Sequence, residues 1–207
     1  MAIKPKLIIF GAGGHGHVVA DIATEVGYSE IVFVDEIYPV SGAQSGWPIV
    51  AASVTKDMKS SHIVVAIGNN INRMKHVKCL LSDGFTLPIL IHPTAYVSPQ
   101  AILGAGCVVM PQAAVNARAV TGIAVIINTG STVDHDCNIA DGVHICPGAH
   151  IAGNVKIGTG SQIGIGSAVR ERIKIGNNVI VAAGAAVVTD ASDNVLMAGV
   201  PAKPRDR

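Results

Sequence analysis

A strict spacing of six residues constrains the fold of this chain more than any other feature. From Val97 to Val187, every sixth residue is aliphatic at fifteen of sixteen positions, and Thr121 is the exception. The residue two positions before each of these is mostly small or slim, as at Ala95 and Cys107. An α-helix repeats about every 3.6 residues and a β-strand about every two, so neither explains this period.

A repeat of six predicts a parallel β-helix, in which each hexad supplies one short strand and one corner and three hexads form a triangular coil. The aliphatic residue fills the interior, and the small residue fits where the corner narrows. The residue just after the aliphatic one is often Gly, Asn or Asp, and we expect it to adopt the positive φ of a tight corner. A β-sandwich is the alternative, but it does not explain a register that is unbroken over residues 97–187.

The composition argues against nucleic acid and membrane as partners. The net charge is +1, so no strong field attracts polyanions. Although 49% of the residues are apolar, no apolar run approaches the roughly 18–20 residues that a membrane span needs. The four cysteines form no C-x-x-C pair and no secretory signal precedes them, so we expect a cytoplasmic protein.

The first ninety residues have a different pattern, in which short apolar runs alternate with helix-like segments. The predicted strands and helices are 6–10, 17–27, 31–34, 47–50, 62–67, 71–82 and 88–91. This alternation predicts a small parallel sheet with helices on its faces. We therefore expect an α/β Rossmann-like domain at residues 1–92, with 88–91 as its last strand and His92-Pro93 closing it. The all-β parallel β-helix, with a short C-terminal tail, follows at residues 93–207.

A glycine-rich loop follows the first predicted strand. Gly11, Gly13 and Gly16 fit G-x-G-x-x-G, and Asp35 lies about twenty residues further on. Such a loop lets backbone N–H groups and a helix N-terminus approach a pyrophosphate. A nucleotide sugar and a nicotinamide dinucleotide both carry one. The domain holds one mononucleotide-sized half and no dehydrogenase substrate domain follows, so the nucleotide sugar is favoured; a purely structural turn is the third alternative.

The combination of motifs resembles a known family. The motifs are GAGGHGHVV at 11–19, VD at 34–35, AIGNN at 66–70, IHP at 91–93, NTGSTVDHDC at 128–137, HICPGA at 144–149 and GVPAK at 199–203. They are similar to those of the sugar O- and N-acyltransferases typified by PglD, NeuD and PerB. The resemblance implies a homotrimer of left-handed β-helices, each with an N-terminal nucleotide-sugar-binding domain and each using acetyl-CoA. The left hand comes from the resemblance alone.

The resemblance also implies roles for individual residues. His135 matches the general base, and Asp136 matches the acidic neighbour that raises its basicity. His144, Ile165 and Ala183 match positions that contact acetyl-CoA, although some members have Gly in place of Ala183. The nucleotide-sugar site is matched by Gly13, Gly14, His15, Asp35, Glu36 and Gly68.

The residues around His135 support a base independently of the resemblance. His135 lies two residues after an interior aliphatic, so its side chain is expected to point outward, between Asp134 and Asp136. Flanking carboxylates would hold the imidazole in one tautomer, and such a base can accept a proton from an attacking amine or hydroxyl. An ordinary solvated surface histidine is the alternative.

A zinc site is the competing chemistry, because γ-class carbonic anhydrases are also left-handed β-helices with three zinc-binding histidines. Here His144 and His150 share a hexad position and so fall on successive faces, His135 is in another register, and the H-x₄-H spacing is absent. We expect no metal site.

The favoured function is acetyl-CoA-dependent N-acetylation of the 4-amino group of a nucleotide-linked 4-amino-4,6-dideoxy sugar in surface glycan or glycoprotein biosynthesis. A UDP-linked bacillosamine-type precursor is the favoured acceptor, with GDP-perosamine or a dTDP-sugar as other candidates. The alternative within the family is a sialic acid O-acetyltransferase. A zinc enzyme of the carbonic anhydrase type and an NAD-binding module are the alternatives from other classes.

Overall fold

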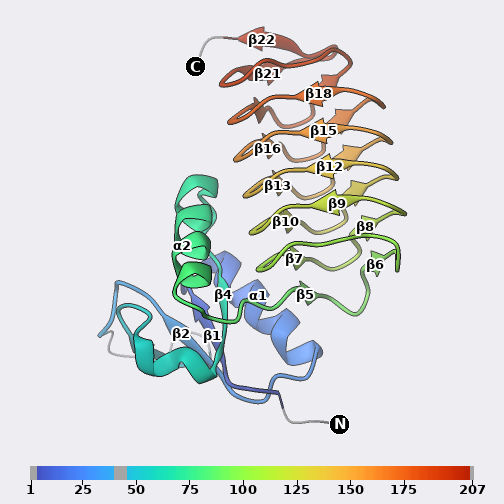
Figure 1. The fold of residues 1–207 in the computed structure, drawn as a ribbon. Coiled ribbons are helices and arrows are strands. Elements are labelled where there is room, and N and C mark those ends of the chain that lie inside the picture. The colour runs from blue at the N-terminus through green and yellow to red at the C-terminus, as the bar shows by residue number, and fades with distance from the viewer. Residues whose placement is uncertain (1–3, 40–45, 206–207) are drawn as a thin grey trace.

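The protein consists of an N-terminal α/β part and a long triangular coil that rises beside it (Figure 1). The computed structural model describes residues 4–39 and 46–205. The coil carries the chain away from the N-terminal part, so that the last described strands lie at the far end of the coil.

Four parallel strands form the sheet of the N-terminal part. Its elements are β1 (Leu7–Phe10), α1 (Gly14–Glu25), β2 (Ile31–Val34), β3 (Ile49–Ala51), the 3-10 helix η1 (Lys56–Ser60), β4 (His62–Val65) and α2 (Asn70–Ser82). The strand order β3-β2-β1-β4 puts β2 and β4 on opposite sides of β1, so the strand order reverses at β1. Open α/β sheets bind ligands at the carboxyl ends of the strands at such a point. The predicted Rossmann-like organisation is confirmed.

The coil has three faces, and each is a parallel sheet of very short strands. The first face contains β5 (Leu90–Ile91), β7 (Val108–Val109), β10 (Ile126–Ile127), β13 (His144–Ile145), β16 (Gln162–Ile163), β19 (Ile180–Val181), β21 (Leu196–Ala198) and, antiparallel at the end, β22 (Lys203–Arg205). The second contains β6 (Tyr96–Val97), β8 (Ala114–Val115), β11 (Thr132–Val133), β14 (His150–Ile151), β17 (Ala168–Val169) and β20 (Ala186–Val187). The third contains β9 (Val120–Thr121), β12 (Asn138–Ile139), β15 (Lys156–Ile157) and β18 (Lys174–Ile175).

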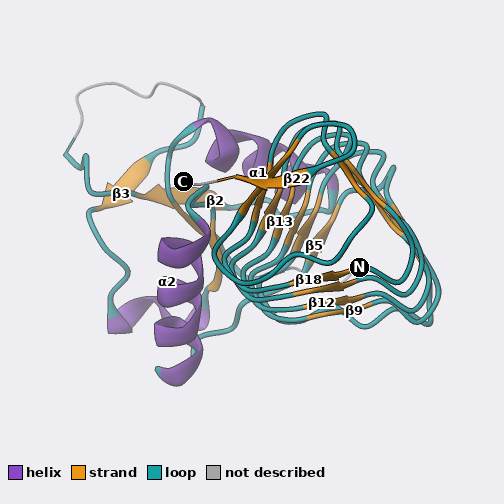
Figure 2. Cartoon of the chain, turned by 90° about the horizontal axis from the view of Figure 1, so that it is seen from above, coloured by secondary structure: helices purple, strands orange, loops and turns teal. Residues whose placement is uncertain are grey.

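The sixfold register fills the interior of the coil as predicted. From Val109 to Val187 each residue of this register is at most 4% exposed. Burial of each aliphatic side chain contributes about 1.5–3 kcal/mol to stability. The exception, Thr121, keeps its hydroxyl paired, because the Gly104 N–H donates to Oγ1 at 3.2 Å. Seen along its axis, the coil is a stack of triangular turns (Figure 2). The predicted left-handed parallel β-helix is confirmed.

The residues that take positive φ at the corners are not the predicted ones. Left-handed φ occurs at the third residue after the interior aliphatic, including Gln112, Arg118 and Asp136 with φ of 58°, 59° and 59°. The predicted position, just after the aliphatic, lies where successive coils stack closely. A Cβ on Gly164 would overlap the carbonyl oxygen of Val181. Glycine is needed there for close approach of two backbones, and not for its positive φ.

Strand β5 belongs to the coil, so the prediction that residues 88–91 form the last strand of the N-terminal domain is wrong. Leu90 pairs with Val108 and Ile91 pairs with Val109 in the first face. Ile91 lies six residues before Val97 and is therefore already in the sixfold register. We propose a boundary between the two domains just before Leu90, in place of residue 92.

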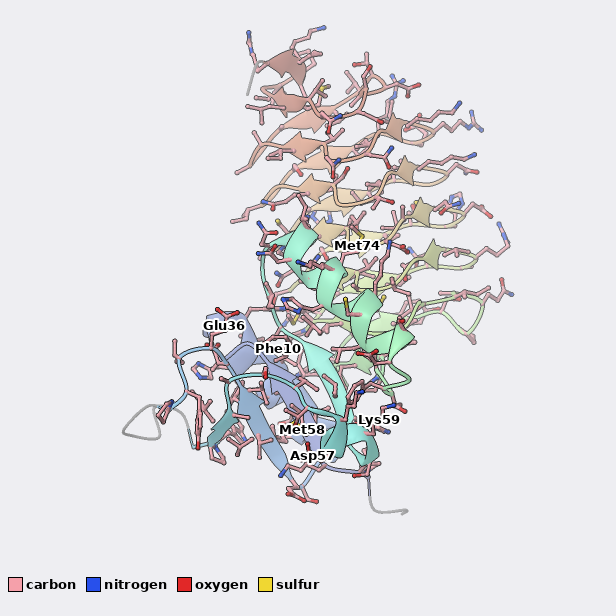
Figure 3. The ribbon with its side chains drawn as sticks, turned by 60° about the vertical axis from the view of Figure 1, so that its left-hand side comes forward. Phe10, Glu36, Asp57, Met58, Lys59 and Met74 are labelled. Atoms are coloured by element: carbon pink, nitrogen blue, oxygen red, sulfur yellow. The ribbon has the colours of Figure 1, made fainter. Side chains whose placement is uncertain are left out.

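Helix α2 runs along the coil and joins the two parts (Figure 1). It packs on the corners between the third and first faces, which carry small residues at successive coils: Gly106, Ala124, Gly142 and Gly160. A Cβ on Gly142 would lie 3.2 Å from Met74, whose side chain projects from α2 towards the coil (Figure 3). On the other side of the sheet, α1 packs in one apolar cluster with Leu90, Val108 and Ile126 of the first face. Within the described residues, no helix is long and apolar enough to cross a membrane.

Candidate active site

His135 lies at a corner between the second and third faces, just after β11. Its side chain is 51% exposed, and its Nδ1 lies 2.7 Å from Oδ2 of Asp136. The pKa of Asp136 is lowered to about 2, chiefly by hydrogen bonds from Arg118 and His135. An ionised carboxylate only accepts hydrogen bonds, so Nδ1 of His135 carries the proton and Nε2 carries the lone pair. The dyad therefore presents a basic nitrogen at the surface of the coil.

Asp134 does not flank the imidazole as the sequence suggested. Its Oδ1 accepts from the backbone N–H of His135 at 2.8 Å and from the side-chain amide of Asn116 at 3.0 Å. The first bond lies within the corner, and the second joins it to the equivalent corner of the coil below, so Asp134 stabilises the turn. Of the two flanking carboxylates, only that of Asp136 is hydrogen-bonded to the ring.

A glycine from the next coil supports the ring of His135. A Cβ built on Gly153 would lie 2.7 Å from both Cε1 and Nε2 of His135. The imidazole is therefore packed against the backbone of Gly153, and any larger residue there would displace it. Nothing in the spacing of the sequence distinguishes Gly153 from the other corner glycines.

The three residues expected to contact acetyl-CoA lie along another part of the coil. His144 is on the first face, while Ile165 and Ala183 are exposed and occupy the same place on successive coils, at the corner between the first and second faces. The backbone N–H of Gly184 donates to the carbonyl of Ile165 at 2.8 Å, which fixes the stacking of these two coils. They lie on one edge of the coil, which borders the face that carries His144.

His144 is held in one neutral tautomer. The backbone N–H of Thr129 donates to Oδ1 of Asn128 at 2.8 Å, so the amide nitrogen of Asn128 faces His144 and donates to its Nε2 at 2.9 Å. Burial, and then the charges of Arg73 and His15, lower the pKa of His144 to about 3. The ring is thus uncharged at neutral pH, with its proton on Nδ1.

The glycine-rich loop divides into structural and open positions. A Cβ on Gly16 would overlap the carbonyl oxygen of Gly11, and Gly11 itself has a φ of 112°. By contrast, a Cβ on Gly13, Gly14 or Gly68 would meet no atom within 4 Å. Gly13 precedes the first turn of α1, where no side chain caps the helix. These three positions therefore leave space beside N–H groups, which is the geometry that suits a phosphate.

Asp35 and Glu36 line a cavity of about 240 Å³ at the carboxyl ends of β1, β2 and β4. The remaining lining residues are Phe10, Gly11, Ile67, Asn72 and His76. Figure 3 shows Phe10 and Glu36 close together at this end of the sheet. Asp35 also fixes the loop, because its Oδ2 accepts from the N–H of Ala12 at 2.7 Å.

A buried arginine connects the two parts beside the site. Arg73 is 1% exposed, and its guanidinium donates to five neutral acceptors. They are the carbonyls of Ala124 and Gly142 on the coil, those of Ile67 and Gly68 after β4, and the side chain of Asn70. Burial lowers the pKa of Arg73 to about 10, so it remains a cation.

His15 lies at the same junction. Burial, and then the charge of Arg73, lower its pKa to about 4. Its Nε2 is the one buried side-chain nitrogen or oxygen without a hydrogen-bond partner among the residues that the structure describes. The chain therefore brings His15 of the glycine loop near His144 of the coil. It does not bring them to His135, which lies at a different edge of the prism.

Comparisons with known proteins show which family the chain belongs to. Residues 6–80 match the family model of the PglD N-terminal domain. A structure of the acetyltransferase domain of PglB from Neisseria gonorrhoeae FA1090 has a TM-score of 0.91 and 44% identity, with 98% of this chain and 100% of that chain covered. The chain belongs to the PglD/PerB-type acetyltransferases.

Two further members of the PglD/PerB-type family are similar. PerB from Caulobacter crescentus, solved in complex with CoA and GDP-perosamine, is 38% identical, with 97% of each chain covered and a TM-score of 0.91. UDP-N-acetylbacillosamine N-acetyltransferase from Bacillus subtilis (strain 168) is 34% identical over 110 residues. That match spans about half of each chain, 51% of this one and 51% of the relative.

Sequence patterns did not find three residues of the site. These are Arg118, Arg73 and Gly153. Each contacts a residue at least 18 positions away in the sequence, namely Asp136, Gly142 and His135 respectively. An eighteen-residue offset is one full coil. The pairing of Arg118 with Asp136 could therefore have been found from the repeat itself, whereas the contacts of Arg73 depend on how α2 docks.

Proposed function

We propose that this protein transfers the acetyl group of acetyl-CoA to the 4-amino group of a nucleotide-linked 4-amino-4,6-dideoxy sugar. The observation that carries the proposal is the His135–Asp136 pair, which presents Nε2 as a base on a coil of the PglD/PerB type. Acetyl-CoA as the donor is supported by the structures of PglB with acetyl coenzyme A and of PerB with CoA.

His135 would act on the attacking amine. The amine nitrogen forms a bond to the thioester carbonyl carbon, the carbon–sulfur bond breaks, and the amine loses one proton to Nε2 of His135. Asp136 stabilises the imidazolium through Nδ1. The proton then passes to the departing thiolate or to water, which restores the neutral imidazole. General base assistance of this kind contributes roughly 10²–10⁴-fold to the rate.

The N-terminal part would bind the acceptor. Gly13, Gly14 and Gly68 leave open space next to N–H groups, which suits the pyrophosphate, while Asp35 and Glu36 line the cavity beside them. A UDP-linked bacillosamine-type sugar is the favoured acceptor, because the curated relative acts on one; GDP-perosamine, found with PerB, is the second candidate. We place this reaction in the cytoplasm and in glycan or glycoprotein biosynthesis.

We also propose that the active unit is a C3 homotrimer. His135 is at the corner between the second and third faces. His144 lies on the first face, and Ile165 and Ala183 lie at the corner between the first and second faces. A neighbouring copy packed on the second face would bring His135 of one chain to the edge of the next chain that carries Ile165 and Ala183, where acetyl-CoA is expected to bind. The outward strand residues of that face include no carboxylate, lysine or arginine: Tyr96, Ala114, Thr132, His150, Ala168 and Ala186. The third face presents Lys156 and Lys174 and suits solvent.

Mixed assemblies test whether the site is shared. Chains carrying His135→Ala and chains carrying His144→Ala, co-expressed with different tags, should regain about a quarter of wild-type activity in randomly assembled trimers. Only interfaces that receive both intact histidines are active. If the mixture is as inactive as the two parents, the site lies within one chain.

The function itself is tested by release of free CoA thiol from acetyl-CoA with a panel of UDP-, GDP- and dTDP-linked amino sugars. We expect thiol release with one 4-amino sugar, and a product whose mass has increased by one acetyl group. The corresponding 4-hydroxy sugars are the matched controls. Acetylation of a sialic acid, with no 4-amino sugar accepted, would contradict the proposal in favour of O-acetylation.

A further inference from the structure

Asp136 is anchored by a second charged group that lies one coil below it. Nε of Arg118 donates to Oδ1 of Asp136 at 2.6 Å, and Nη2 donates to Oδ2 at 2.8 Å. This two-point arrangement fixes the plane of the carboxylate. Oδ2 is shared, because it also receives Nδ1 of His135 at 2.7 Å. Arg118, Asp136 and His135 thus form one chain of charge-assisted hydrogen bonds.

The same arrangement sets the charge that the imidazole experiences. Asp136 contacts the ring directly, and Arg118 offsets the charge of Asp136 from its far side. Asp134 is turned to the backbone of the corner, and the next coil contributes Gly153, which has no side chain. Without the arginine, the uncompensated carboxylate would favour the protonated imidazole, which cannot act as a base.

We propose that Arg118 is a positioning residue of the acetyl transfer, which orients Asp136 towards His135 and offsets the negative charge that the carboxylate places beside the imidazole. This inference rests on the proposed function of His135. Arg118 touches neither substrate in this account. It acts on the reaction only through the carboxylate.

The position of Arg118 makes it suitable for substitution. Its side chain is 63% exposed, so little packing is lost with it. Its left-handed φ of 59° is matched by Ala124, an alanine at φ 58° one corner further along the chain. Alanine is therefore accommodated at such a corner. Gln112, at φ 58° and exposed one corner earlier, provides the control Gln112→Ala.

The test measures kcat/KM from pH 6 to pH 9 for the wild type and for Arg118→Ala, Arg118→Lys and Gln112→Ala. We expect Arg118→Ala to lose about tenfold at the acidic end, as is common when the partner of a functional side chain is removed. The loss should shrink as pH rises, so that the acidic limb of the profile lies at higher pH. Comparison with the wild type cancels the titration of the acceptor amine. Arg118→Lys should recover much of the loss, and Gln112→Ala should match the wild type.

A double-mutant cycle with Asp136→Asn completes the test. If Arg118 acts through the carboxylate, Arg118→Ala should add less than about twofold to the loss caused by Asp136→Asn. A uniform loss at all pH values, a profile that superimposes on the wild type, or additive losses would overturn the inference. The proposed function fails by a different result, namely a wild type without acetyl transfer or a His135→Ala variant with full activity.

Discussion

Replacement of Arg73 by methionine tests how the two parts of the molecule are held together. Methionine keeps most of the length of the side chain and removes the guanidinium. The five acceptors of Arg73 then lose their donor, and three of these hydrogen bonds are buried: those to Ala124, Gly142 and Asn70. A buried polar group left without a partner costs about 1–3 kcal/mol, which gives a gross loss of about 3–9 kcal/mol.

Part of that loss is offset, because Arg73 is a cation among neutral groups. Its removal from a buried site relieves a desolvation penalty of several kcal/mol. We therefore expect Arg73→Met to lower the free energy of unfolding by about 3 kcal/mol, or the Tm by about 6–12 °C for a chain of this size. Arg73→Lys keeps the charge but cannot span both the loop after β4 and the coil, so its loss should be intermediate.

Urea unfolding at a fixed protein concentration measures these differences, with Lys75→Met as the control. Lys75 is exposed on the same helix, so its replacement should change stability by less than about 0.5 kcal/mol. If Arg73→Met were as stable as Lys75→Met, or more stable than the wild type, the desolvation penalty of Arg73 would equal or outweigh its hydrogen bonds, contrary to this prediction.

Three further predictions concern the site. Gly13→Val should weaken binding of the nucleotide sugar while acetyl-CoA binding is retained, because the new side chain fills the open space at the start of α1; calorimetry showing the reverse would reassign the loop. Changing Asp35 and Glu36 to Ala should reorder the preference across the acceptor panel, and an unchanged ranking with unchanged KM would reduce them to surface charge. Because the pKa values of His15 and His144 are lowered to about 4 and about 3, the unfolded chain binds more protons below pH 6.5. The contribution of these two histidines to the free energy of unfolding should be complete above that pH and fall as pH drops towards 3. Each histidine should lower the free energy of unfolding by up to about 1.4 kcal/mol per pH unit. Urea unfolding of His144→Gln should show a weaker dependence of stability on pH.

The sequence predicted what depends on periodicity and missed what depends on docking. The sixfold register predicted the coil and its interior residues, because one aliphatic side chain per hexad can be buried only inside such a coil. The same register continues back to Ile91, and this was missed because the residues around β5 also read as the end of an α/β alternation. The charges flanking His135 were visible, but local spacing could not show that Asp134 bonds to the backbone while Asp136 bonds to the ring. Arg73 looked like an ordinary helix residue, and its burial follows only from the small corner residues on which α2 packs.

The kcat of His135→Ala at pH 7, measured together with the Kd of the acceptor, decides whether His135 is the base of an acetyl transfer. We expect a kcat at least about 100-fold below the wild type. Acceptor binding by calorimetry should be unchanged, and the loss should decrease as pH rises and more of the amine is unprotonated. A variant that keeps nearly full kcat while acceptor binding collapses would show instead that His135 binds the acceptor and takes no part in proton transfer.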